Sequence, residues 1–458
     1  MNLARHSITP TKPVLILDAR FDADCAIFTV STPAGFAVYQ SHPLRLLRTR
    51  EITGGTLTTV LPCHTSSLLF LVGGGRSPRY PPNKVVFWDD ALGKEVAELE
   101  FRERVRGLAC RRGWLAVALR RRVVVFQLGA SVSRYGEWDT SDNPRGLLTL
   151  ATGAYATLLA IPGKQLGHVH LVHLPPCAPP TPVGPPSAPP PKPPPPLRGD
   201  PVPIIAAHTS ALNTLTSSPS GRLLATTSER GTLVRVWDAH TGKLAREFRR
   251  GSDKAVIYGV AFRPDEAELC VWSDKGTVHV FALVSSGPGP SNRQSTFSPL
   301  TPFLPLPKYF DSEWSYAQYR IPAQSAHISL SAPGPRPSTE DVVDEERCVV
   351  GWIEAPREDE RKGEFQLIVL TYSGGWYRLS LPKSGTSGSG AHNQQRHPTS
   401  PMSSSPPSVK NFPGVRSRAR SSSGSSARGR DKGKEREHEG RDCTLQEFRR
   451  FGRWDGWG

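Results

Sequence analysis

An internal repeat constrains the fold of this 458-residue chain more than any other feature of its sequence. Residues 85–99 and 234–248 match at a constant offset without gaps: each has an apolar strand ending in Trp-Asp, then Gly-Lys, then Glu and a large apolar residue. The Ser-Glu-Arg-Gly-Thr turn that begins at Ser228 returns as Ser-Asp-Lys-Gly-Thr at Ser273, forty-five positions later. Repeats of this length, built of short strands, are typical of propeller blades.

The predicted fold is therefore all-β, a seven-bladed β-propeller of WD-like repeats with disordered insertions. Short apolar stretches separated by turn residues recur through residues 13–383, which accommodate seven units. Residues 175–203 contain sixteen prolines in twenty-nine positions, which excludes a central strand and predicts an insertion between two repeats. Residues 384–440 form a low-complexity tract that we expect to be disordered, whereas the apolar residues of 441–458 predict a segment that packs on the last blade.

The composition favours an anionic partner. The formal net charge is +16, which suits nucleic acid or the cytoplasmic face of a membrane. Part of this charge lies in the Ser/Gly-rich residues 410–441, and part in the arginines of residues 102–127, which we interpret as a solvated sheet edge protected from aggregation. Seven scattered cysteines without a C-x-x-C spacing indicate a reduced, cytoplasmic protein. No apolar run is long enough to span a bilayer, so membrane contact is expected to be peripheral.

Two consecutive arginines, Arg249 and Arg250, follow the second copy of the repeat. Neighbouring side chains of an extended strand point to opposite faces, so these two should serve two different pockets. A guanidinium matches a phosphate bidentately, and Gly251 permits a turn that residues with a Cβ avoid. The first copy carries Glu100 and Phe101 at these positions, so the repeat itself does not need arginines there. We expect their replacement to leave stability nearly unchanged.

Small polar side chains and imidazoles flank the arginine pair in both neighbouring repeats. Hydroxyl and imidazole groups can donate hydrogen bonds to a phosphate. The same residue types are also ordinary structural parts of WD repeats, and only their position beside the arginines favours a binding role. The first repeat supplies His208, Ser228 and Thr232, and the second supplies Ser273, Thr277 and His279.

Other constellations are weaker. Residues 447–450 repeat Glu-Phe-Arg-Arg, but they lack the following glycine and the flanking turns, and we interpret them as a coincidental copy. His168, His170 and His173 suggest a metal, yet only the first two share a strand face and no carboxylate or cysteine completes a ligand set nearby. We expect no metal, no cofactor and no catalytic residues, because only isolated histidines and serines favour an enzyme.

These motifs together resemble the PROPPIN family, the WD-repeat proteins that interact with phosphoinositides. The family signature F/L-R-R-G, between the fifth and sixth blades, is found here at residues 248–251. The similarity extends from about Phe21 to Leu381. It includes Asn-Lys-Val-Val-Phe-Trp-Asp-Asp at 83–90, typical of one subgroup, and Phe-Asp-Ser-Glu-Trp-Ser at 310–315. The resemblance implies a propeller that binds phosphatidylinositol 3-phosphate and 3,5-bisphosphate at two rim sites, inserts a loop of blade six into the membrane, and acts in autophagy and endolysosomal traffic.

The resemblance also implies roles for particular residues. The membrane loop would be residues 284–308, which contain no acidic residue and set apolar side chains among prolines. Asp24 matches the side of the propeller that engages the large autophagy lipid-transfer protein, although Asp22 stands where the family usually has Asn. By position, the first site would use His208, Ser228, Thr232 and Arg249, the second Arg250, Ser273, Thr277 and His279, and the loop Phe297, Leu300, Phe303 and Leu304.

The main hypothesis is a monomeric, peripheral phosphoinositide effector, recruited from the cytoplasm to preautophagosomal, endosomal or vacuolar membranes and binding no nucleic acid. The alternative is a WD-repeat interaction scaffold without a lipid ligand. The two differ in one measurable respect, because binding by such a scaffold would follow net charge and not the position of the phosphate on the lipid.

Overall fold

The computed structural model describes residues 15–64, 66–179, 193, 195, 199–284, 290–294, 312–322, 347–355, 363–382 and 442–452. All regular secondary structure in these ranges is β-strand. The predictions for the tract 384–440 and for Phe297, Leu300, Phe303 and Leu304 lie outside the described residues.

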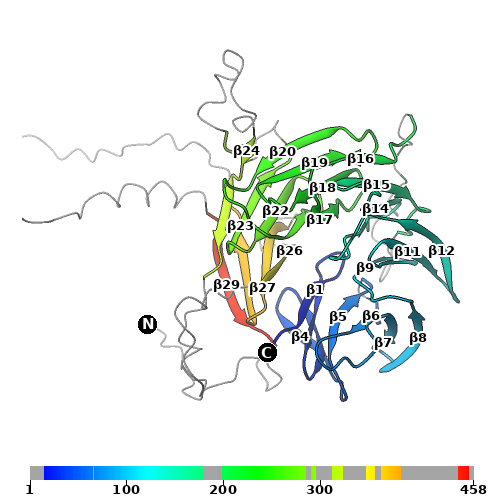
Figure 1. Cartoon of the computed structure of the whole chain (residues 1–458). Coiled ribbons are helices and arrows are strands. Elements are labelled where there is room, and N and C mark those ends of the chain that lie inside the picture. Colours follow the sequence, from blue (N-terminus) through cyan, green and yellow to red (C-terminus); the bar gives the residue numbers. More distant parts are fainter. Residues whose placement is uncertain are drawn as a thin grey trace, which may run out of the picture. The chain divides into compact units, whose positions relative to one another are not determined.

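The first four sheets follow one another along the chain (Figure 1). Blade 1 consists of β1 (Asp18–Phe21), β2 (Ile27–Thr32), β3 (Gly35–Gln40) and β4 (Arg45–Glu51). Blade 2 consists of β5 (Leu57–Pro62), β6 (Leu68–Gly73), β7 (Lys84–Asp89) and β8 (Lys94–Glu100). Blade 3 consists of β9 (Gly107–Arg111), β10 (Trp114–Ala118), β11 (Arg122–Leu128) and β12 (Val132–Asp139). Blade 4 consists of β13 (Thr149–Leu150), β14 (Leu158–Pro162), β15 (His168–His173) and β16 (Ile204–Ala206).

Three further sheets complete the set. Blade 5 consists of β17 (Leu212–Ser217), β18 (Leu223–Ser228), β19 (Leu233–Asp238) and β20 (Leu244–Arg249). Blade 6 consists of β21 (Ile257–Phe262), β22 (Glu268–Ser273), β23 (Thr277–Ala282) and β25 (Ala317–Arg320). Blade 7 consists of β26 (Cys348–Ala355), β27 (Glu364–Thr371), β28 (Gly375–Ser380) and β29 (Thr444–Arg450). The short β24 (Glu313–Trp314) adds a parallel fifth strand to the outer edge of blade 5.

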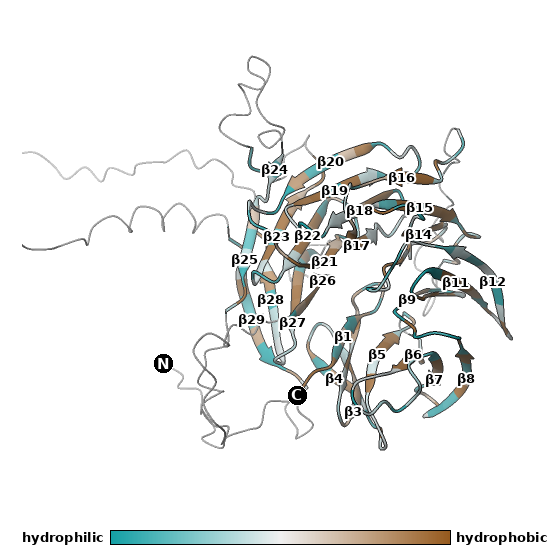
Figure 2. Ribbon diagram, in the orientation of Figure 1, coloured by the Kyte–Doolittle hydropathy of each residue, from teal (hydrophilic) through white to brown (hydrophobic). Residues whose placement is uncertain are grey.

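The innermost strands form a closed ring. Each of β1, β5, β9, β13, β17, β21 and β26 contacts the inner strand of the next blade, and β26 contacts β1 (Figure 1). The predicted seven-bladed β-propeller is therefore confirmed. Figure 2 shows hydrophobic residues concentrated on the inner and middle strands, whereas outer strands such as β8 carry hydrophilic ones. This distribution follows from the pleat, because the faces of neighbouring blades bury each other.

Blades 1 and 7 close the ring through aromatic packing. Phe28 and Trp376 are fully buried in one apolar cluster that both blades share. Phe451, just after β29, packs edge-on against Phe28 with ring centroids 5.4 Å apart. The indole N–H of Trp376 donates to the Ser41 carbonyl at 3.1 Å, and the backbone N–H of Gly452 donates to the Tyr39 hydroxyl at 3.0 Å. A fully buried aromatic side chain contributes roughly 1.5–3 kcal/mol, so closure depends on the chain beyond residue 442.

The proline-rich insertion lies within a blade and not between two repeats as the sequence pattern suggested. It separates β15 from β16, and β16 pairs with β15 as the outer strand of blade 4. A three-residue outer strand leaves little periodic pattern, which is why residues 204–206 resemble the beginning of the following repeat.

The Asn-Lys-Val-Val-Phe-Trp-Asp-Asp stretch joins blade 2 to blade 1. The Asp90 carboxylate accepts a hydrogen bond from Arg50 Nε at 2.7 Å, and the Asp90 carbonyl accepts one from Arg50 Nη2 at 2.6 Å. Trp88 Nε1 donates to the same carboxylate at 3.4 Å. Asn83 Nδ2 donates to the Phe101 carbonyl at 2.7 Å and so fixes the end of the outer strand. The stretch is thus explained by contacts that hold the blades together.

Candidate functional site

The arginine pair lies where blade 5 ends and the chain passes to blade 6. Arg249 is the last residue of β20 and pairs in the ladder with Leu233 on one side and with Trp314 of β24 on the other. The backbone N–H of Arg250 donates to the Thr232 carbonyl at 3.0 Å. Both arginine side chains are buried, with exposed fractions of 8% for Arg249 and 7% for Arg250. They belong to the junction of two blades and not to a solvated strand end.

The Arg250 guanidinium is held by backbone carbonyls. Its Nε donates to the Gly231 carbonyl at 3.0 Å, and its Nη2 donates to the Asp253 carbonyl. Burial lowers the pKa of Arg250, and the nearby carboxylates of Asp274 and Asp253 oppose this shift. A guanidinium has five N–H donors in a planar fork, so the remaining donors are available to a further acceptor.

Of the second predicted set, His279 is the residue whose electrostatics are tied to Arg250. The pKa of His279 is lowered to about 4, chiefly by burial and further by the positive charge of Arg250, so these two side chains are close enough to interact. His279 Nδ1 lies 3.1 Å from the Ser315 hydroxyl. Ser273 is buried at the end of β22, and Thr277 begins β23 four residues later. The set contains a guanidinium, two hydroxyls and an imidazole, which are groups that can donate hydrogen bonds to an anion.

The first predicted set is divided between a turn and a blade interior. Ser228 and Thr232 belong to the turn that contains Gly231, whose carbonyl binds Arg250. His208 is buried, and its Nε2 lies 2.9 Å from the Thr226 hydroxyl. The same hydroxyl oxygen accepts the indole N–H of Trp237 at 2.9 Å. His208 therefore takes part in a network that stabilises blade 5, and burial lowers its pKa to about 4. Only its Nδ1 is left for a ligand.

Sequence analysis did not identify three residues that the structure places at this junction. Asp274 is buried beside Arg250 and forms an ion pair with Lys275 at 3.6 Å. Trp314 and Ser315 approach from a segment more than sixty positions beyond Arg249. No local pattern connects Trp314 and Ser315 to the arginines. The signal that the sequence offered for these two residues was their place in the Phe-Asp-Ser-Glu-Trp-Ser stretch.

The coincidental copy at residues 447–450 has different surroundings. Phe448 has an exposed fraction of 45%, whereas Phe248 is fully buried. Arg449 forms an ion pair with Glu447 at 2.5 Å on the exposed outer strand β29. In blade 4, His173 Nδ1 lies 2.9 Å from the Thr157 hydroxyl. No group of three potential metal ligands occurs in the described part of the chain.

Asp24 lies on a different part of the propeller, in the turn after β1. Its carboxylate is 3.7 Å from His64 Nδ1 and 3.9 Å from Arg112 Nη2, and it remains largely exposed. The His64 side chain lowers the pKa of Asp24. Asp22, two residues earlier, is buried, and one of its carboxylate oxygens accepts the Ile27 N–H at 3.1 Å. Its other oxygen has no hydrogen-bond partner among the described residues.

Replacing Asp22 by Asn should raise the free energy of unfolding near neutral pH. Burial raises the pKa of Asp22 from 3.8 to about 6, so between these values the folded state binds a proton that the unfolded state lacks. Stability therefore falls as pH rises through this window, by up to about 3 kcal/mol. Asp22→Asn removes this loss, although its amide N–H keeps part of the burial cost. Denaturant titrations on both sides of the window test this, and equal effects at both pH values would contradict it.

This chain is similar to a known family of propellers. A propeller whose fifth and sixth blades meet at a buried arginine pair defines a narrow class. The family model described as PROPPIN matches residues 199–310. SVP1-like protein 2 of Pichia angusta is 30% identical over 363 residues, which cover 79% of this chain and 92% of that protein. SVP1-like protein 2 of Emericella nidulans is 35% identical over 283 residues, which cover 60% and 78%.

Solved structures share the fold. The crystal structure of Kluyvelomyces marxianus Hsv2 aligns with a TM-score of 0.56 at 21% identity, covering 80% of this chain and 93% of that one. KlAtg21, in a complex with the coiled-coil of AgAtg16, aligns with a TM-score of 0.54 at 17% identity, covering 81% and 95%. The chain belongs to the PROPPIN family. PROPPINs are phosphoinositide-binding β-propellers of autophagy that attach peripherally to membranes, and they are generally scaffolds without enzymatic activity. Among the described residues, no helix is long and apolar enough to cross a membrane.

Proposed function

We propose that this protein recognises phosphatidylinositol 3-phosphate and 3,5-bisphosphate and acts as an effector in autophagy and endolysosomal or vacuolar traffic. The observation that carries the proposal is the bonding of Arg250. Its buried guanidinium donates to two carbonyl oxygens, and no carboxylate of the described residues forms an ion pair with it. The Asp253 and Asp274 carboxylates act on the pKa of Arg250 but form no direct ion pair with it, so the guanidinium keeps donors for an incoming anion.

Two phosphate pockets would lie on opposite sides of the arginine pair. In the proposed first pocket Arg249 acts with the hydroxyls of Ser228 and Thr232, and His208 contributes at most through Nδ1. In the proposed second pocket Arg250 acts with Ser273, Thr277 and His279. The low pKa of His279 makes it a neutral donor before binding, and a doubly charged phosphate would raise that pKa by attraction.

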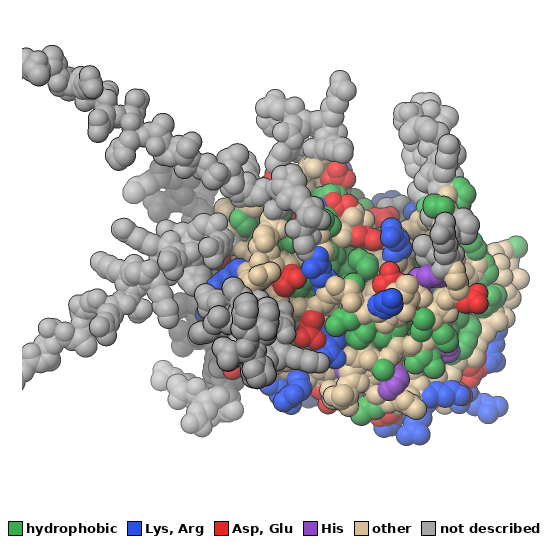
Figure 3. Space-filling model, turned by 90° about the horizontal axis from the view of Figure 1, so that it is seen from above, with side chains coloured by type: hydrophobic (Ala, Val, Ile, Leu, Met, Phe, Trp, Pro, Cys, Tyr) green, Lys and Arg blue, Asp and Glu red, His purple; other side chains and the backbone are tan. Residues whose placement is uncertain are grey.

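The face of the propeller along β16, β20 and β24 carries charges of both signs among its described residues. Figure 3 shows the face that lies uppermost in Figure 1, where β16, β20 and β24 run. Basic and acidic side chains are interspersed on this face, with hydrophobic side chains between them. The proposal assigns selectivity for an anion to the buried arginines and not to these mixed surface charges.

A lipid panel tests the proposal against the scaffold alternative. Vesicles containing phosphatidylinositol 3-phosphate, phosphatidylinositol 4-phosphate or phosphatidylserine at matched total charge are sedimented with the protein. Of these three lipids, the proposal expects binding to phosphatidylinositol 3-phosphate alone. A second set of vesicles that contain phosphatidylinositol 3,5-bisphosphate should also bind the protein. Equal binding to all anionic vesicles would favour the scaffold without a lipid ligand.

Membrane residence is proposed to need apolar side chains from residues 284–308 as well. Changing Phe297, Phe303 and Leu304 together to Ser should sharply reduce vesicle co-sedimentation but spare binding of a soluble inositol phosphate headgroup. Burial of each side chain contributes roughly 1.5–3 kcal/mol at most, because insertion at the interface is partial. Leu300 is the fourth apolar residue of this set. A parallel loss of headgroup binding would instead assign these side chains to packing.

The partner face is also a proposal. The Asp24 side chain is largely exposed, and we propose that it contributes to binding of the large autophagy lipid-transfer protein. KlAtg21 forms a complex with the coiled-coil of AgAtg16, and this chain is proposed to accept a coiled-coil partner as well. The protein would be a cytoplasmic monomer, recruited to preautophagosomal, endosomal or vacuolar membranes.

A further inference from the structure

Residues 312–316, here called the strap, contact both candidate pockets. The strap contains β24, in which Glu313 pairs with Phe248 and Trp314 with Arg249 in a parallel ladder. It follows residues 295–311 in the chain and leads directly into β25 of blade 6. In the chain, the strap follows the proposed membrane segment and precedes β25. In space, it pairs with β20, the strand that ends at Arg249.

On the side of blade 5, the strap is fixed by two side-chain contacts to β20. The Ser312 hydroxyl donates to Glu247 Oε1 at 3.2 Å. Arg246 Nη1 donates to Glu313 Oε1 at 3.1 Å, with both side chains only partly exposed. Arg246 and Glu247 lie three and two residues before Arg249, so these contacts fix the strap next to the first pocket.

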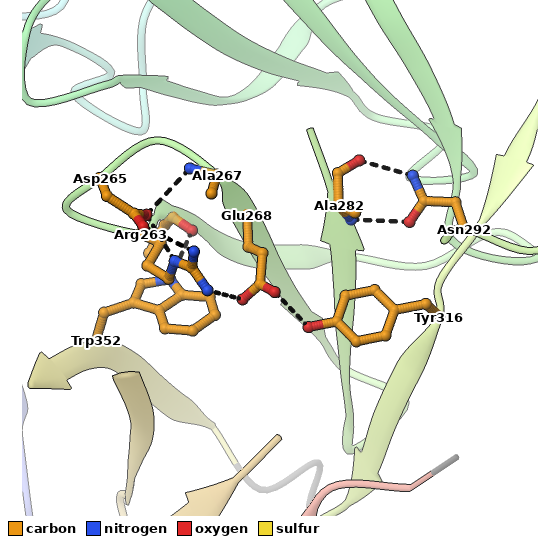
Figure 4. Close-up of polar contacts among 9 residues, drawn as sticks. Arg263, Asp265, Ala267, Glu268, Ala282, Asn292, Tyr316 and Trp352 are labelled. Carbon is orange, nitrogen blue, oxygen red and sulfur yellow. Dashed lines mark hydrogen bonds and ion pairs between the residues drawn. The ribbon is translucent and has the colours of Figure 1, made fainter. Parts of the chain in front are cut away.

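On the side of blade 6, the strap contacts the second pocket and a buried polar network. The Ser315 hydroxyl lies 3.1 Å from His279 Nδ1. The Tyr316 hydroxyl donates to Glu268 at 2.7 Å, and Glu268 is ion-paired with Arg263 at 2.9 Å (Figure 4). Because Glu268 is buried, this network is a rigid support for the end of the strap.

The chain that leaves blade 6 is fixed at the same place. Asn292 Nδ2 donates to the Ala282 carbonyl at 2.7 Å, and its Oδ1 accepts the Ala282 N–H at 2.8 Å (Figure 4). Asn292 Nδ2 also lies 2.6 Å from Glu313 Oε2. The backbones of Arg293 and Trp314 exchange two hydrogen bonds, of 3.0 and 2.7 Å. Glu313 therefore joins the outgoing chain, the returning chain and β20.

We propose that the strap couples the phosphate pockets to membrane engagement, with Glu313 as the positioning residue. This inference rests on the proposed function. Headgroup binding and apolar insertion strengthen each other most when the two elements are held at a separation that lets both reach the membrane, because this raises their effective concentration. Glu313 touches neither proposed pocket directly, but it holds together the described residues on both sides of residues 295–311, with Asn292 before them and the strap after them. The coupling is reciprocal, so binding by either element favours binding by the other.

The test separates headgroup affinity from membrane affinity in one variant. Glu313→Ala is expected to weaken binding to phosphatidylinositol 3-phosphate vesicles about tenfold, while affinity for soluble inositol 1,3-bisphosphate changes less than about twofold. Glu137→Ala is the matched control, because Glu137 is ion-paired with Arg122 at 2.7 Å on the outer strand of blade 3 and has a similar exposed fraction, 22% against 21%. Calorimetry measures the headgroup and flotation measures the vesicles.

Rescue distinguishes positioning from simple structural support. The double variant Arg246→Glu with Glu313→Arg restores the ion pair with reversed polarity but not the hydrogen bond from Asn292, and is expected to recover part of the vesicle affinity. Should Glu313→Ala not fold, Ser312→Ala removes a weaker contact of the same strap and is measured in the same two assays. Unchanged vesicle binding, or parallel loss of headgroup and vesicle binding without rescue, overturns the coupling. Wild-type protein that ignores the 3-phosphate in both assays overturns the proposed function itself.

Discussion

Replacing Arg249 and Arg250 together by Thr is expected to abolish binding to phosphatidylinositol 3-phosphate vesicles, with a loss of affinity of at least about a hundredfold. Each arginine would contribute a charge-assisted hydrogen-bonding group to a different pocket, and such bonds are worth about 1.5–3 kcal/mol each. Two of them together correspond to roughly two to four powers of ten in affinity. Flotation with wild-type protein and the double variant measures the loss directly.

The same variant should also cost stability, which revises the expectation from the repeat pattern. Glu100 and Phe101 at the corresponding positions suggested that arginines are dispensable there. In the structure both side chains are buried, and Arg250 donates to the carbonyls of Gly231 and Asp253. Leaving these acceptors without a donor should cost about 1–3 kcal/mol. The thermal unfolding of the variant must therefore be measured as well, and the binding assay is run at a temperature well below the midpoint of that unfolding transition.

The coincidental copy supplies a control with the same chemistry. Arg449 and Arg450 changed to Thr remove the same two charges from an exposed outer strand. Vesicle binding and the unfolding midpoint should both stay close to wild type, since exposed ion pairs contribute little. Comparable losses from the two double variants would show that bulk charge, and not the junction of blades 5 and 6, drives binding.

The fold could be predicted because its information is repeated along the chain. The Trp-Asp strand and the Ser-x-x-Gly-Thr turn recur along the chain, and the turn recurs at the spacing of one blade. Burial of the apolar strand faces then packs neighbouring blades together. The arginine pair could be predicted because one copy of the repeat departs from the other. The position of the proline-rich insertion was predicted wrongly, since the three residues of β16 carry too short a pattern to reveal a strand after it.

The details of the pockets could not be predicted, because the same residue types serve structure and binding. His208 bonds to Thr226, which also accepts from Trp237, and nothing in the sequence separates that network from a ligand site. The contact of Ser315 with His279 joins positions far apart in the chain. Contacts of this kind depend on how neighbouring blades face each other, which local propensity does not encode.

Arg111 is another residue whose structural role could not be predicted from the sequence. The arginines of residues 102–127 were interpreted as a solvated sheet edge, yet Arg111 has an exposed fraction of 0%. Its Nη1 donates to the Ala156 carbonyl at 2.6 Å and its Nη2 to the Pro175 carbonyl at 2.6 Å. Burial lowers its pKa, and the guanidinium lies over the Trp114 ring at 5.8 Å. A charged side chain here joins blade 3 to blade 4 through backbone carbonyls.

Arg111→Met is therefore expected to lower the free energy of unfolding by about 2–4 kcal/mol, among the largest effects of any single substitution in the propeller. Methionine fills part of the volume but donates no hydrogen bond, so the carbonyls of Ala156 and Pro175 lose their guanidinium donor. Denaturant unfolding measures the change, with the exposed Arg121→Met as the matched control, expected to stay within about 0.5 kcal/mol. If Arg111→Met were as stable as the control, the desolvation of the buried charge would offset the free energy of its hydrogen bonds. The junction of blades 3 and 4 would then depend on apolar packing alone.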